Sequence, residues 1–113
     1  MISQELLKGS LKTIILRLLE ENGRMYGYDI SKRVEELTEG KIVLNYGALY
    51  PVLHRLLAEG QIKSEEEAIG KRVRIYYSLT ETGKEASLLS LQDFIDYVDT
   101  MKLIINPPKP AIG

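Results

Sequence analysis

The stretch from residue 47 to residue 79 constrains the fold of this chain more than any other part of the sequence. Its first part repeats apolar residues every three or four positions, the spacing of one buried helix face, and Gly60 closes that helix. Residues 61–67 and 73–79 then read as two strands around a loop at 68–71, and the second strand alternates apolar and polar side chains. A helix that leads into such a hairpin is typical of a winged helix-turn-helix.

Two helices are expected before that stretch. The first follows Ser10, which is a suitable N-cap, and ends at Asn22-Gly23. The second repeats apolar residues at helical spacing over residues 29–37. A short strand is expected at 41–44. The segment before Ser10 packs either on the same core or on a second subunit.

A long helix is expected to open at Thr80 and to end before the prolines that follow Asn106. It carries two apolar flanks, which is more than one small domain can cover. This pattern predicts a winged helix-turn-helix domain at 1–80, a dimerisation helix at 81–105 and an extended tail at 106–113. The fold class is mainly α with a small β hairpin. The interface of the dimer is expected to contain Leu6, Leu7, Leu11, Leu88, Leu91, Phe94, Ile95, Val98 and Met101.

The composition excludes several classes of protein. A chain of 113 residues with 44% hydrophobic and 27% charged residues suits one folded domain. No apolar run reaches the length of a membrane span and the N-terminus has no signal-like block, so we expect a cytoplasmic protein without a membrane partner. Cysteine is absent and His54 is the only histidine, so a metal site, a cofactor and an enzymatic acid-base or nucleophile set are not expected.

The net charge of -1 does not by itself suggest a nucleic-acid partner, but the distribution of the charges does. The excess of acidic residues lies C-terminal, and Glu65–Glu67 are followed closely by the cationic cluster of Lys71, Arg72 and Arg74. A local positive patch can therefore survive on the hairpin and contact the phosphates of double-stranded DNA.

The helix before the hairpin is expected to enter the major groove, because its outer face is small and lightly polar. His54 and Arg55 are the strong hydrogen-bonding side chains on that face, and Arg55 is the better candidate for a guanine edge. Tyr50 lies on the border between the buried and exposed faces. The DNA-binding residues are expected to be Tyr28, Lys32, Tyr46, Gly47, Ala48, Tyr50, Pro51, His54, Arg55, Lys71, Arg72 and Arg74.

Four short motifs occur in order along the chain: Tyr26–Ile30 (YGYDI), Gly47–Leu56 (GALYPVLHRL), Glu59–Ile62 (EGQI) and Tyr76–Gly83 (YYSLTETG). Each alone is a weak signal, but together they closely resemble the PadR family of transcriptional regulators, over about residues 6–102. The resemblance implies a dimeric winged-helix repressor of the short subgroup with a single C-terminal dimerisation helix. Family members often act on promoters of detoxification, efflux or stress genes, and some are relieved by small aromatic ligands.

Two departures limit this resemblance. Glu66 stands where an aromatic residue is expected, which makes the first wing strand unusually acidic. The chain also has no tryptophan, so the stacking pocket that some short members form between their C-terminal helices cannot be transferred to it.

We therefore expect a sequence-specific, DNA-binding transcriptional regulator, a homodimeric repressor that reads a pseudo-palindromic operator. The alternative is a winged helix that serves as a protein-interaction module without binding DNA. A small-molecule effector is left unassigned.

Overall fold

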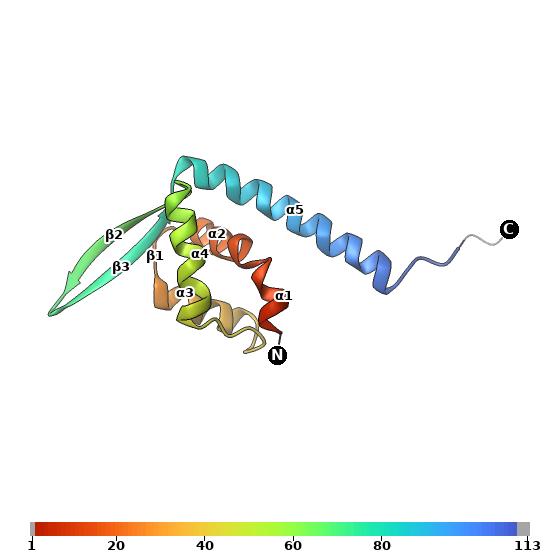
Figure 1. Ribbon diagram of the computed structural model, residues 1–113, viewed down its shortest axis with the longest axis horizontal. Coiled ribbons are helices and arrows are strands. Elements are labelled where there is room, and N and C mark those ends of the chain that lie inside the picture. Colours follow the sequence, from red (N-terminus) through yellow and green to blue (C-terminus); the bar gives the residue numbers. More distant parts are fainter. Residues whose placement is uncertain (1, 111–113) are drawn as a thin grey trace.

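Five helices and a three-stranded sheet make up residues 2–110, the part of the chain that the computed structural model describes (Figure 1). The helices pack into a small body from which the β2–β3 hairpin projects on one side and the long helix α5 on the other. The bounds are α1 Gln4–Lys8, α2 Leu11–Asn22, β1 Met25–Tyr26, α3 Gly27–Leu37, α4 Tyr46–Ala58, β2 Ile62–Ile69, β3 Arg72–Leu79 and α5 Glu81–Ile105. This arrangement confirms a winged helix-turn-helix with a C-terminal helix.

The core lies where α2, α3 and α4 meet. Ile15 and Leu19 of α2, Ile30 of α3, and Leu49 and Leu53 of α4 are fully buried there. Each side chain of this size contributes about 1.5–3 kcal/mol when it is removed from water. The helical spacing of apolar residues thus predicted the packed faces of these helices correctly.

The segment before α2 forms the short helix α1 and packs on this same core. Leu7 and Leu11 are 3% and 5% exposed, whereas Leu6 is 71% exposed. The expectation that all three contribute to a dimer interface is corrected accordingly. Leu7 and Leu11 are buried in the core of their own chain. Of the three leucines, only Leu6 has a side chain that is exposed for contact with a partner.

The sheet has the order β1-β3-β2 and is antiparallel throughout. Strand β1 is only two residues long, so it left no alternation in the sequence and was not predicted. Ile69 pairs with Arg72, which leaves Gly70 and Lys71 as the hairpin turn in place of the expected loop at 68–71. The φ of +62° at Gly70 suits such a two-residue turn, because glycine accepts positive φ without a steric penalty.

Residues 41–44 are not a strand, which corrects that prediction. The Ile42 amide donates to the Thr38 hydroxyl at 3.0 Å, and the Leu44 side chain is buried in the core. An apolar run of this length marks a buried segment as readily as a strand, and here the connection between α3 and α4 supplies the burial.

Helix α4 begins at Tyr46, where the Asn45 side chain accepts a hydrogen bond from the Ala48 amide at 2.8 Å. The helix continues through Pro51. Leu49, Val52, Leu53 and Leu56 form its buried face, as predicted.

Helix α5 opens as expected, with the Thr80 hydroxyl accepting from the Gly83 amide at 3.0 Å. A Cβ on Gly83 would lie 1.8 Å from the Gln61 carbonyl oxygen, so only glycine allows this close approach of α5 to the start of the wing. A hydrogen bond between the Thr13 and Ser90 hydroxyls joins α5 to α2. None of the described helices combines the length and apolarity of a membrane span. Residues 106–110 follow without helix or strand, and positions 111–113 of the predicted tail lie outside the described residues.

Candidate nucleic-acid interface

The outer face of α4 is exposed, as the sequence predicted. Gly47, Pro51, His54 and Arg55 are all exposed, whereas Ala48 is half-buried and offers less surface than expected. Because the opposite face fills the core, this outer face is free to approach a groove of DNA.

Three aromatic side chains form a continuous stripe along one edge of that face. The ring centres of Tyr46 and Tyr50 are 5.1 Å apart, and those of Tyr50 and His54 are 4.1 Å apart. Tyr50 is 37% exposed, which confirms its place at the border between the buried and exposed faces. Such contacts restrict the rotamers of the three rings, so the stripe presents a preorganised surface.

The cationic residues of the hairpin lie at and near its tip. Lys71 lies in the turn, and Arg72 and Arg74 of β3 follow it, all three exposed. They are not equally available to a partner, because the Arg74 guanidinium lies 4.9 Å from the centre of the Tyr26 ring. Arg74 is thus held against β1, while Lys71 and Arg72 extend the wing into solvent.

Arg24 is a wing residue that the sequence did not reveal. Its guanidinium lies 3.8 Å from the centre of the Tyr76 ring and forms an ion pair with Glu67. The hydrogen bond to Glu67 raises the pKa of the Arg24 guanidinium above its ordinary value. Part of the unusual acidity of β2 therefore serves to bind an arginine of the same chain.

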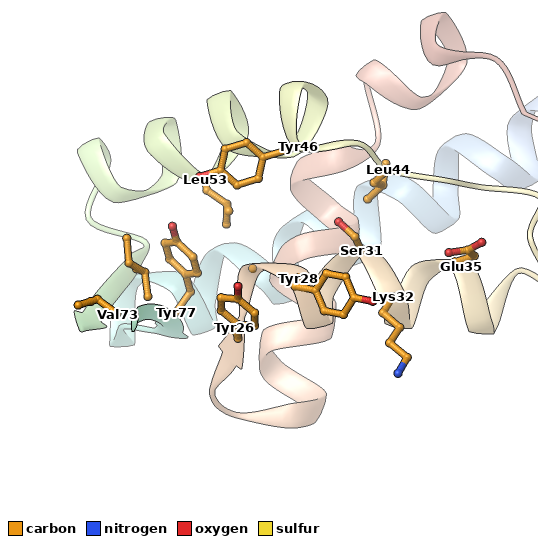
Figure 2. A pocket seen from close by; sticks show the side chains of 12 residues that line it. Tyr26, Tyr28, Ser31, Lys32, Glu35, Leu44, Tyr46, Leu53, Val73 and Tyr77 are labelled. Atoms are coloured by element: carbon orange, nitrogen blue, oxygen red, sulfur yellow. The ribbon is translucent and has the colours of Figure 1, made fainter. Parts of the chain in front are cut away.

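A groove of about 520 Å³ separates α4 from the hairpin (Figure 2). We call it the wing groove; its walls include Tyr28 of α3, Tyr46 and Leu53 of α4, and Ile75 and Tyr77 of β3. Tyr28 and Tyr46 are exposed at its mouth, and Tyr77 is buried. Burial raises the pKa of Tyr77, and the neighbouring hydroxyls of Tyr46 and Tyr50 add to this effect. Tyr28 and Tyr46 were expected to touch DNA, and the structure places both beside the hairpin.

Helix α5 exposes apolar side chains at and beyond the positions predicted for the dimer interface. Leu88 and Ile95 are exposed, while Leu91, Phe94, Val98 and Met101 are half-buried. Further exposed apolar side chains occur at Leu89, Tyr97, Leu103, Ile104 and Ile105.

Within residues 2–110, no cluster of three or more His, Cys, Asp or Glu side chains is placed to hold a metal ion.

The architecture and the motifs together point to one family. The sequence profile of the transcriptional regulator PadR-like family matches residues 15–87, which is more than half of the chain. The chain belongs to this family. PadR-like proteins are transcriptional regulators, so the winged helix found here is the domain of a regulator of transcription.

Solved structures and a curated relative agree with this assignment. A transcriptional regulator from Clostridium thermocellum is 33% identical, superposes with a TM-score of 0.76, and is matched over 96% of this chain and 100% of its own. A PadR family transcription regulator from Clostridium difficile is 27% identical with a TM-score of 0.72, over 86% of this chain and 99% of its own. The transcriptional regulator YqjI of Escherichia coli is 34% identical over 68% of this chain, but the match spans only 35% of that protein.

Proposed function

We propose that this PadR-like regulator binds double-stranded DNA as a homodimer and represses transcription. The observation that carries the proposal is the placement of α4 beside the hairpin. Tyr46 of α4 and Ile75 of β3 border the same groove, so the exposed start of α4 adjoins the hairpin that carries Lys71 and Arg72.

In this proposal α4 enters the major groove and the wing follows the adjacent backbone. His54 and Arg55 reach base edges, with Arg55 offering a bidentate contact to guanine. Lys71 and Arg72 contact phosphates, which position the protein without reading sequence. Tyr28 and Lys32 on the exposed side of α3 contribute further backbone contacts.

The second subunit is argued from α5. Exposed Leu88 and Ile95 form part of an apolar surface that a soluble monomer would leave open to water. A second copy of the chain would cover it by two-fold symmetry. The domain then comprises residues 1–80 and the dimerisation helix residues 81–105. Two α4 helices placed about 34 Å apart would read a pseudo-palindromic operator. Binding to DNA also implies a location in the cytoplasm.

The proposal is tested by selecting DNA fragments from a random pool and titrating the best fragment by fluorescence anisotropy at several salt concentrations. We expect enrichment of an inverted repeat, two chains bound per fragment, and affinity that falls steeply with salt. Repression is then measured with a reporter under a promoter that carries the repeat. A chain that enriches no sequence and binds without dependence on salt would instead be a protein-interaction module.

A further inference from the structure

We propose that Glu66 determines the base preference of the wing. Its carboxylate accepts a hydrogen bond from the 2-amino group of guanine, in the minor groove beside the major groove that α4 enters. The inference rests on the proposed function, to which it adds the kind of base pair that the wing selects.

Glu66 lies on the face of the hairpin that is turned towards α4. It pairs with Ile75 across the two strands, and directly opposed residues of an antiparallel pair point to the same face. Ile75 lines the wing groove together with Tyr46 of α4. Figure 2 shows Val73 and Tyr77, which share the face of Ile75, in the space bordered by α4. Glu66 therefore belongs to the side of the wing that adjoins the proposed DNA-reading helix.

Glu66 is the only charged side chain that β2 and β3 place on this face. The other positions of the face are apolar or aromatic, apart from an uncharged serine at 64. Glu65 and Glu67 lie on the opposite face, where Glu67 is paired with Arg24. Glu66 itself is exposed, and within residues 2–110 it forms no ion pair.

The cations of the wing lie elsewhere. Arg72 and Arg74 alternate with Val73 and Ile75, so they project from the face opposite Glu66, and Lys71 lies in the turn. Phosphate binding needs positive charge, which the strands do not provide on the α4 side. The apolar surface around Glu66 suits the sugars and base edges of a groove better than the phosphates that border it.

The wing is long enough to reach such a groove. Strands β2 and β3 each span eight residues, which is about 26 Å of extended chain, and Glu66 lies in the outer half of β2. The hairpin projects from the helical body (Figure 1). The major groove is about 12 Å wide, so a hairpin beside α4 extends past the bordering phosphates to the minor groove beyond them.

The chemistry of a carboxylate then fixes the base pair. An ionised carboxylate accepts hydrogen bonds and donates none. In the minor groove both A·T orientations present only acceptors, and the 2-amino group of guanine is the donor that a G·C pair adds. A-tracts also have a narrow minor groove with enhanced negative potential, which repels a carboxylate. Glu66 should therefore favour G·C under the wing and disfavour A·T.

Base analogues test this preference directly. The base pairs under the wing are located on the selected operator by hydroxyl-radical footprinting. They are then replaced by G·C, by A·T, by inosine·C, which lacks the 2-amino group, or by 2,6-diaminopurine·T, which restores it. In anisotropy titrations the wild type should bind the two fragments with the amino group about three- to tenfold more tightly than the two without it.

Neighbouring glutamates give a matched pair of variants. Glu66→Ala should reduce the ratio of the two affinities to about one, mainly by raising affinity for the fragments without the amino group. Glu65→Ala removes the same charge one position away, on the opposite face, and should keep the wild-type ratio. Both side chains are exposed, so thermal unfolding of the two variants should match that of the wild type.

The outcomes separate this inference from the proposed function. Equal affinity of the wild type for the G·C and inosine·C fragments would overturn the role of Glu66 and leave DNA binding standing. The same holds for a preference that survives Glu66→Ala or is lost equally in Glu65→Ala. A uniform gain of Glu66→Ala on all fragments would show only repulsion by phosphates and would also overturn the base preference. A chain that binds none of the fragments would overturn the proposed function, and this inference with it.

Discussion

The guanidinium carbon of Arg24 lies 3.8 Å from the centre of the Tyr76 ring, and its Nη2 lies 2.5 Å from a Glu67 carboxylate oxygen. Arg24 precedes β1, Tyr76 belongs to β3 and Glu67 to β2, so one side chain fastens all three strands together. Strand β1 pairs with β3 at only two positions, and the backbone alone holds this edge weakly. The contact therefore adds a side-chain link between the start of β1 and the two strands of the hairpin.

Removing the contacts of Arg24 with Tyr76 and Glu67 should weaken DNA binding without removing a phosphate contact. We expect Arg24→Ala to lower operator affinity by about two- to fivefold, because the wing samples more orientations. The slope of log affinity against log salt should stay unchanged. Arg17→Ala is the matched control, since Arg17 is equally exposed and pairs with Glu21 on α2. An altered salt slope for Arg24→Ala would show that Arg24 itself contacts the backbone.

The wing cations should differ in their contribution to the salt dependence. Lys71→Ala and Arg72→Ala should each lower the salt slope by about one and weaken binding to all sequences alike. Arg74→Ala should change the slope less, because its guanidinium already lies over the Tyr26 ring. Lys102→Ala on α5 serves as the control. Equal slopes for all four variants would remove the wing from the interface.

The outer face of α4 should decide sequence preference. Arg55→Ala and His54→Ala should each cost about 1–3 kcal/mol on the selected operator and leave binding to random DNA nearly intact. Both side chains are exposed, so thermal unfolding should change little. Arg33→Ala, an exposed arginine on α3, is the control. If Arg55→Ala lowers the melting temperature sharply, Arg55 is a structural residue.

The oligomeric state can be tested with residues that the single chain leaves exposed. Leu88→Asp combined with Ile95→Asp should give a folded monomer in sedimentation velocity experiments and lose operator affinity. Leu37→Asp introduces the same charge at an exposed site on α3 and should remain dimeric. A wild-type chain that sediments as a monomer at micromolar concentration would refute the dimer.

Adjacent leucines of α1 separate core from surface. Leu7 is 3% exposed and Leu6 is 71% exposed. We expect Leu7→Ala to cost about 2–5 kcal/mol in the free energy of unfolding, because it leaves a cavity, and Leu6→Ala to cost less than about 0.5 kcal/mol. Urea unfolding followed by far-UV circular dichroism measures both. Similar costs for the two variants would contradict the placement of α1 on the core.

The order of the helices α2 to α5, the hairpin and the outer face of α4 could be predicted from the sequence, whereas the short helix α1 was not. Each rests on a local pattern, namely the spacing of apolar residues along α2 and α4, the cap at Thr80, and the alternation along β3. The positive charge at the tip of the hairpin could also be predicted, because Lys71 and Arg72 are neighbours in the sequence.

Tertiary structure decided what depends on residues far apart in sequence. Arg24 and Glu67 are 43 positions apart, and no local pattern relates them. Strand β1 exists only because β3 offers it a partner, and residues 41–44 lack such a partner within the described chain. The floor of the wing groove likewise joins Leu53 to Tyr77, which come from a helix and a strand. Local patterns specify whether a segment forms a helix or a strand and which of its faces is buried. Which other elements it contacts depends on how the buried faces pack together, and this packing is a property of the whole chain.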